Sequence, residues 1–289
     1  SGIQQSIEKR RHADKYLSQH IKEMDLLLFG LTFAVLFILG MPIAFAMISS
    51  TLVYAFMNHV DLGFLGMQMF TSLNNFVFVA IPLFMLTAEV MERSSVSDRI
   101  FKFANSLVGY ISGGLGHVNV LTSIIFAGMS GSSVADVGGI GHLCCRAMIN
   151  AGYDEDFSAA TTITSSIIGP IIPPSIPMII YAMVSGSSVG KLFFGGAMPG
   201  LLFGLILMVY IYFVSKKRKY PKQKAPAFKV LIVQFLASFV VAILPLLTPV
   251  ILLGCIYFGM VTVTEAAIIA TIYTCILGFL VYRKLGITQ

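Results

Sequence analysis

Serine, glycine and aspartate residues cluster within one strongly apolar part of the chain, at residues 128–136. The segment reads Gly-Met-Ser-Gly-Ser-Ser-Val-Ala-Asp. Its serines supply hydroxyl oxygens, an unwound glycine backbone supplies carbonyl oxygens, and Asp136 supplies a carboxylate. Hard cations prefer such oxygen ligands, which predicts a sodium site. An acid within a membrane segment is a functional candidate by default, and the alternative is that Asp136 caps the helix that resumes after the break.

A second interruption follows at residues 169–177, which read Gly-Pro-Ile-Ile-Pro-Pro-Ser-Ile-Pro. Relative to alanine, glycine costs a helix about 1 kcal/mol and proline about 3 kcal/mol. In a bilayer the freed backbone groups also have no water to bond with. Broken helices are tolerated there when they line a cavity, where they can hold ions and anionic substrates. Free amides at the start of a half-helix would favour an anionic substrate.

The composition places the chain among polytopic, all-α membrane proteins. Of its 289 residues, 57% are hydrophobic and 11% are charged, whereas soluble domains carry about 25% charged residues. The net charge of +6 comes from short basic blocks between apolar runs. Such blocks set membrane orientation, so we expect no nucleic-acid partner. The four cysteines have no zinc or redox spacing and are interpreted as packing residues.

Enzymatic chemistry is not indicated. The segment 186–191 is one residue short of a phosphate-binding P-loop and lacks its final Ser or Thr. A nucleophile–base pair would have to combine Ser132 or Ser133 with His117 or His142, and packing or capping is the preferred interpretation of both histidines. We therefore expect no catalytic residue and no cofactor, with sodium as a coupling ion.

Several helices must position these breaks. The run 24–57 is broken at Gly40–Pro42 and forms either two short spanning helices or one kinked helix. The segment 64–92 fits a re-entrant hairpin whose tip lies between Asn74 and Pro82, and the alternative is a spanning helix kinked at the proline. At the tip, an Asn74 or Asn75 amide oxygen would complete the sodium shell.

Further helices are expected on both sides of the second break. Residues 101–126 are expected to form a helical stretch in which glycines allow close packing. Residues 192–214 and 231–254 are expected to span the membrane, the second with proline kinks. Thr262 and Glu265 fit a capping box that opens the next helix. The basic blocks at 216–224 and 283–284 mark cytoplasmic ends.

Several motifs together resemble the large membrane subunit of tripartite ATP-independent periplasmic (TRAP) transporters, over about residues 25–285. They are Gly128–Asp136, Ile171–Ser175, Ala197–Gly200, Thr262–Ala267 and Ala80–Phe84, in matching order and spacing. The resemblance implies a sodium-coupled importer in the bacterial inner membrane with an elevator mechanism. A periplasmic binding protein would deliver a carboxylate such as a dicarboxylate, keto acid or sialic acid. A small membrane subunit, which some members carry in the same chain, would brace the scaffold.

The resemblance also implies a division of the chain and a set of site residues. Residues 1–23 would be a linker helix (alternatively a solvated tail), 24–60 scaffold, 61–190 half of a transport domain, 191–257 scaffold with a basic loop at 215–229, and 258–289 a further helix. The predicted sodium-binding residues are Asn74, Asn75, Gly128, Ser130, Gly131, Ser132, Ser133 and Asp136. The predicted substrate-facing residues are Ser166, Gly169, Pro173, Pro174 and Ser175.

One departure from the family pattern limits what this chain should do alone. The family's large subunit has a second, inverted half, and this chain stops at Gln289 without it. A site at the interface of two repeats needs both, so we expect a fragment that does not transport by itself. The rival functions are a channel, and an ion-coupled carboxylate transporter that needs no binding protein.

Overall fold

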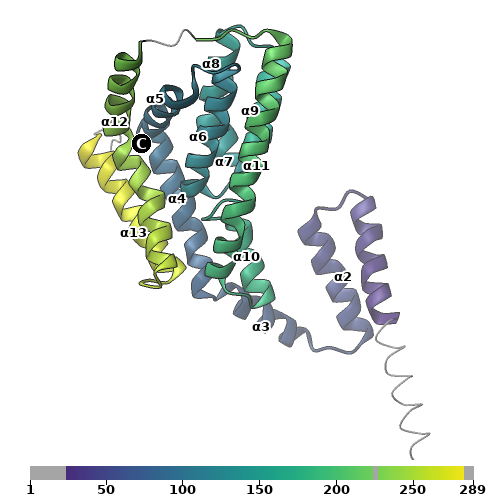
Figure 1. The fold of residues 1–289 in the computed structure, drawn as a ribbon. Helices are drawn as coiled ribbons and strands as arrows, with labels where there is room; N and C mark the ends of the chain where they lie inside the picture. The colour runs from purple at the N-terminus through teal and green to yellow at the C-terminus, as the bar shows by residue number, and fades with distance from the viewer. Residues whose placement is uncertain (1–23, 224–226, 283–289) are drawn as a thin grey trace, which may run out of the picture. The chain divides into compact units, whose positions relative to one another are not determined.

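A computed structural model describes residues 24–223 and 227–282, and within these ranges the chain is helical and contains no strand (Figure 1). In this described part of the chain, three helices are long and apolar enough to cross a membrane: Val189–Arg218, Lys229–Tyr257 and Val263–Val281. The bent pair Leu62–Leu73 and Phe76–Arg93 would add a fourth span if it is counted as one. The predicted all-α membrane fold is confirmed at this level. The linker helix expected at 1–23 lies outside the described residues.

The chain divides into two compact units, the first ending at Asn74 and the second beginning at Asn75. Within the first unit, the helix Met24–Ile38 is followed by α2 (Ile43–Met57) and α3 (Leu62–Leu73). Gly40 adopts the left-handed conformation with φ +84° and Pro42 directly precedes α2, a position that needs no N–H. The predicted break at 40–42 therefore separates two helices.

The second unit contains the remaining elements. They are the 3₁₀-helix η1 (Phe76–Val79), α4 (Ala80–Arg93), α5 (Val96–Val108), α6 (Gly114–Ser130), α7 (Ser133–Asp136), a π-helical turn (Val137–Gly141), α8 (His142–Asn150), α9 (Glu155–Ser166), α10 (Ile176–Ser185), α11 (Val189–Arg218), α12 (Phe228–Tyr257), α13 (Val263–Ile276) and a second π-helical turn (Leu277–Val281). Helix α6 is central: it contacts α4, α5, α8, α9, α11 and α12.

Close helix packing depends on small residues, as the sequence predicts. A Cβ added to Gly204 of α11 would lie 2.6 Å from Ile124 Cδ1 of α6, and one added to Gly116 would lie 2.8 Å from Ile211 Cγ2. Both distances are shorter than a van der Waals contact, so a larger residue at either position would force the isoleucine side chain or the helices to shift.

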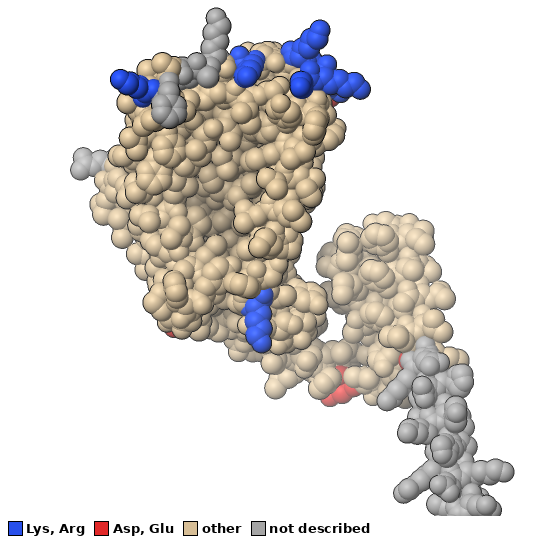
Figure 2. Space-filling view, viewed as in Figure 1, with Lys and Arg blue, Asp and Glu red and all other residues tan. Residues whose placement is uncertain are grey.

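Two boundary predictions are wrong. The stretch 101–126 is two helices, because the chain turns at Gly113, which has φ +78° and packs against Ser215 where a Cβ would lie 2.3 Å from the hydroxyl oxygen. The basic loop predicted at 215–229 is shorter, because α11 continues to Arg218 and α12 starts at Phe228. Side chains of Lys and Arg gather at this end of the unit (Figure 2).

Other local predictions are confirmed. Thr262 and Glu265 form the reciprocal capping box at the start of α13. Helices α11 and α12 include the predicted spans, and Pro245 and Pro249 lie inside α12.

In the segment 64–92 the chain breaks at Asn74–Asn75, while Pro82 lies in the first turn of α4, where its missing N–H costs little. Whether this segment forms a re-entrant hairpin stays a prediction.

Candidate ion and substrate site

The first predicted break is a sharp stop and restart between α6 and α7. Helix α6 ends at Ser130, and Gly131 follows in the left-handed conformation with φ +60°, which glycine adopts without steric penalty. Ser132 is the N-cap of α7, and its hydroxyl oxygen accepts a hydrogen bond from the Ala135 N–H at 3.4 Å. The serine–glycine spacing thus ends one helix and begins the next.

The second break packs directly on the first. The Ile176 N–H donates to the Gly131 carbonyl at 3.4 Å. A Cβ on Gly131 would lie 2.3 Å from the Pro174 carbonyl oxygen, and one on Gly169 would lie 3.1 Å from the Ser132 carbonyl carbon. The two interruptions therefore cross backbone against backbone, and glycine is required at the crossing.

Two serines predicted for the site are fully enclosed and engaged with nearby backbone. Ser175 is 0% exposed, and its hydroxyl donates to the Pro170 carbonyl at 2.5 Å and accepts from the Met178 N–H at 3.3 Å. Ser130 is 1% exposed and its oxygen accepts from the Ser132 N–H at 3.5 Å. These bonds hold the broken backbone in shape without water.

Asp136 lies at the end of α7 and is 0% exposed. Neither carboxylate oxygen has a hydrogen-bond partner among the described residues. Its polar neighbours are the Ser123 hydroxyl of α6 and the Ser166 hydroxyl of α9. A buried carboxylate without a partner is costly. Its side chain makes no capping hydrogen bond to the helical turn that follows, so Asp136 stays a candidate ion ligand.

The remaining predicted residues take several positions. Gly128 packs against Pro249 of α12, where a Cβ would lie 2.9 Å from the proline Cβ. Ser133 is partly exposed. Ser166 is buried and donates to the Thr162 carbonyl at 2.8 Å. Its hydroxyl neighbours Asp136, and its carbonyl accepts from the Gly169 N–H at 3.1 Å at the start of the second break.

The two predicted asparagines each lie at the boundary of a helical element. Asn75 is exposed, and its side-chain oxygen accepts from the Val77 N–H at 3.0 Å as the N-cap of η1. Helix η1 contacts α10, which starts at the second break. Asn74 belongs to the first unit, where it ends α3.

Sequence reasoning missed a buried polar network between α6 and α9. The Asn119 amide nitrogen donates to the Thr162 hydroxyl at 2.7 Å, and the Asn119 amide oxygen accepts from the Ser165 hydroxyl at 3.2 Å. Ser123 in turn donates to Ser165 at 3.1 Å. The signal was present: Asn119 and Ser123 lie four residues apart, and Ser158, Thr162 and Ser165 repeat every three or four residues, so each set forms one helix face.

Replacing Asn119 by alanine is expected to lower the free energy of unfolding by about 2 to 4 kcal/mol, since it leaves a cavity and removes buried hydrogen bonds to Thr162, Ser165 and the Met148 sulfur. Thermal unfolding in detergent would measure the change. Asn105→Ala in α5 is the control, because the Asn105 side-chain oxygen has no hydrogen-bond partner among the described residues and its loss should cost far less. Equal decreases in unfolding temperature in the two variants would show that the hydrogen bonds of the network do not stabilise the fold.

The side chains at the two breaks differ from those of a transition-metal site. Within the described ranges, no group of three or more His, Cys, Asp or Glu side chains could hold a metal ion. The candidate ligands are instead hydroxyls, backbone carbonyls and one carboxylate, which match a hard cation.

Comparisons with known proteins agree on one family. Residues 31–289 match the model of the tripartite ATP-independent periplasmic transporter, DctM component. The chain is 44% identical over 261 residues to the sialic acid TRAP transporter large permease protein SiaM of Vibrio cholerae, covering 89% of this chain and 58% of the relative. It is 40% identical to the sialic acid TRAP transporter permease protein SiaT of Haemophilus influenzae, covering 88% and 41%. It is also 40% identical to the C4-dicarboxylate TRAP transporter large permease protein DctM of Pseudomonas aeruginosa, covering 78% and 52%. The chain thus spans about half the length of these curated relatives.

Proposed function

Because this chain belongs to the DctM family of tripartite ATP-independent periplasmic transporters, we propose that it forms part of the membrane subunit of a sodium-coupled importer of an organic acid. The family and the relatives are transport permeases and not enzymes, as the sequence predicts for this chain. The proposed location is the bacterial inner membrane, with the basic end of α11 in the cytoplasm.

The observation that carries the proposal is the backbone crossing of the two breaks beside a buried acid. Gly131 and Pro174 meet there, and Asp136 lies one short helix away without a partner. Bare carbonyls and half-helix ends at such a crossing are suited to cations and anionic substrates. An ordinary channel lining would need neither the enclosed carboxylate nor this close backbone contact.

Sodium is proposed to bind at the first break. The ligands are drawn from the hydroxyls and carbonyls of Gly128–Ser133 and the Asp136 carboxylate, with Asn74 or Asn75 joining from the start of η1 if that segment folds back as a hairpin. Ser166 is proposed to lie between the two sites, because its hydroxyl neighbours Asp136 and its carbonyl bonds to Gly169 of the second break. The substrate is proposed to meet the second break at Gly169, Pro173, Pro174 and Ser175.

The transported molecule is proposed to be a carboxylate, with sialic acid, a C4-dicarboxylate or a keto acid as candidates. The names of the relatives include sialic acid, C4-dicarboxylates and 2,3-diketo-L-gulonate. The proposed partners are a periplasmic binding protein and a small membrane subunit, joined to this chain or separate. An elevator movement of the residues around the two breaks would carry the site across the membrane.

Uptake by proteoliposomes tests the proposal. The complete transporter containing this chain, with its small subunit and binding protein, is expected to accumulate one labelled carboxylate only when sodium is higher outside. Omitting either sodium or the binding protein should reduce uptake to background. Flux independent of both would favour a channel, and flux that needs sodium alone would favour a carboxylate transporter without a binding protein.

Ser132→Ala is expected to weaken sodium activation about tenfold, since it removes one oxygen ligand and the N-cap of α7, and an N-cap alone contributes about 1 kcal/mol. The sodium concentration giving half-maximal uptake would measure the effect. Ser188→Ala is the matched control, because Ser188 is the N-cap of α11 and its hydroxyl oxygen accepts from the Lys191 N–H at 3.5 Å, outside the breaks. Ser188 lies in the string Ser-Gly-Ser-Ser-Val at 185–189, which repeats residues 130–134. Unchanged sodium activation in Ser132→Ala would place the ion elsewhere.

A further inference from the structure

An apolar groove of about 410 Å³ lies between α9 and α11. Its walls include Phe157, Ala160 and Thr164 from α9 and Phe203, Ile206 and Tyr210 from α11. The side chains of Ile206 and Tyr210 are 59% and 60% exposed, so the groove opens to the outside of the unit. None of the residues of the Asn119 network lines it, which separates the groove from the candidate ion site.

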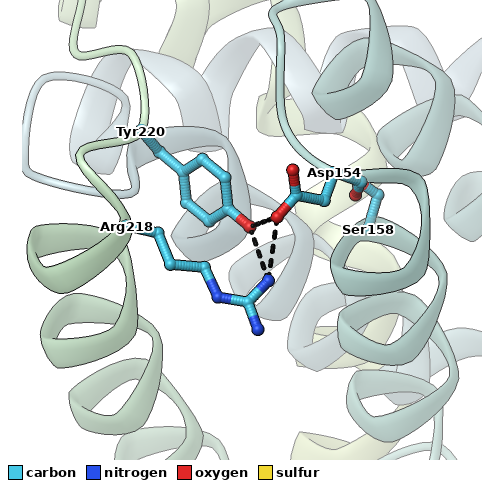
Figure 3. Close-up of polar contacts among 4 residues, drawn as sticks. All are labelled: Asp154, Ser158, Arg218 and Tyr220. Atoms are coloured by element: carbon cyan, nitrogen blue, oxygen red, sulfur yellow. Dashed lines mark hydrogen bonds and ion pairs between the residues drawn. The ribbon is translucent and has the colours of Figure 1, made fainter.

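A polar cluster lies beyond one end of the groove, where α9 begins and α11 ends (Figure 3). Arg218 Nη1 donates to Asp154 Oδ2 at 2.8 Å, and the Tyr220 hydroxyl donates to the same oxygen at 2.5 Å. The Arg218 guanidinium also lies 5.8 Å from the ring of Phe157, which lines the groove. The Tyr220 hydroxyl and Arg218 lower the pKa of Asp154, so this end of the groove keeps paired charges at neutral pH.

Positive charge exceeds negative charge at this end. Five basic residues lie between 216 and 222, and three acidic residues occupy 154–156 at the start of α9, one of them paired with Arg218. Lys217 follows Tyr210 by seven residues, two helical turns, and therefore lies on the groove face of α11. Figure 2 shows basic side chains gathered around this end of the unit.

The depth of the groove matches one leaflet of a bilayer. Tyr210 and Phe203 precede Arg218 by eight and fifteen residues, which at 1.5 Å per residue is about 12 and 22 Å. One leaflet contributes about 15 Å of hydrocarbon. A headgroup level with Lys217 would place its acyl chain along the groove.

The lining of the groove favours a flexible apolar chain as its occupant. Its walls are apolar side chains apart from Thr161, Thr164 and the Tyr210 hydroxyl. Only the positively charged end beyond Tyr210 offers a place for an anionic group.

We propose that the α9–α11 groove is a binding site for an anionic phospholipid, with one acyl chain between Ala160 and Ile206 and the phosphate beside Lys217. The lipid would fill the space between α9 and α11 at a point where α9 leads directly into the second break. This proposal does not depend on the identity of the transported molecule or on sodium.

Native mass spectrometry of the complete transporter tests the site. The protein would be reconstituted in vesicles of equal phosphatidylglycerol and phosphatidylcholine and then released in mild detergent. The original protein is expected to retain phosphatidylglycerol over phosphatidylcholine. Ala160→Phe should remove one retained lipid, while Ala159→Phe, an exposed neighbour that does not line the groove, should not. Lys217→Gln should reduce the preference about fivefold, while Lys191→Gln at the other end of α11 should leave it unchanged.

Two results would overturn the proposal. Equal lipid retention in Ala160→Phe and Ala159→Phe, with no effect of Lys217→Gln, would show that no lipid occupies the groove. Retention of the lipid by the large subunit prepared without the small subunit, but not by the complete transporter, would show that a partner helix covers the groove. The Lys217 variant changes only an exposed side chain, so it decides the headgroup assignment even if Ala160→Phe lowers the yield of folded protein.

Discussion

Gly131→Ala is expected to abolish uptake and to destabilise the fold by about 2 to 5 kcal/mol. The first cause is the backbone: an alanine at φ +60° pays about 1 to 2 kcal/mol for the left-handed conformation. The second is steric, because the new Cβ would lie 2.3 Å from the Pro174 carbonyl oxygen, and forced overpacking costs about 1 to 3 kcal/mol. Backbone cannot rotate away as a side chain can, so the two breaks must separate. Uptake and thermal unfolding of the same preparation would measure both effects.

Gly186→Ala separates the two causes. Gly186 ends α10 with φ +68°, but nothing lies within 4 Å of its Cβ position. This variant should lose only the stability associated with the left-handed conformation and should retain most of the uptake. If Gly131→Ala behaves no worse than Gly186→Ala, contact between the breaks is not needed for transport.

The positions of the breaks could be predicted because they rest on local chemistry. Glycine and proline act on the backbone wherever they occur, so the interruptions at 128–136 and 169–177 needed no knowledge of the neighbours. The repeated string Ser-Gly-Ser-Ser-Val shows the same local rule. At both copies a helix ends at the first serine and the glycine turns left-handed, and a serine then caps the next helix. The two copies of the string therefore stop one helix and start the next in the same way.

What the sequence could not supply was which residues meet. Gly131 contacts Pro174 because the intervening helices fold back on each other. The spacing of residues in the sequence does not predict that path. The Asn119 network was missed for a related reason. A single asparagine in an apolar helix can be assigned to a polar network only when its partners are known, and these are Thr162 and Ser165 on another helix. Gly113 was interpreted as a packing residue, whereas its contact with Ser215 of α11 makes it the turn between α5 and α6.

Asp136→Asn is expected to eliminate the stabilisation of the transporter by sodium while leaving it as stable as the original protein, or more stable, when sodium is absent. An amide costs less to bury than a carboxylate, and neither carboxylate oxygen has a hydrogen-bond partner among the described residues to lose. With sodium at 100 times its dissociation constant, an intact site should add about 2.7 kcal/mol to the free energy of unfolding. Thermal unfolding in sodium and in choline chloride, at equal ionic strength, would measure the difference.

Asp156→Asn makes the same change of charge at an exposed position in the first turn of α9 and should keep the full sodium response. The comparison distinguishes two roles for Asp136. If the acid only shaped the restart of the helix, its removal would lower stability equally in both salts and leave the response to sodium intact. If it holds the ion, sodium-dependent uptake and sodium-dependent stability must disappear together, because both draw on the same binding free energy. A variant that lost sodium-driven uptake but kept sodium stabilisation would move the ion away from Asp136 and leave the acid a role in the movement of the site.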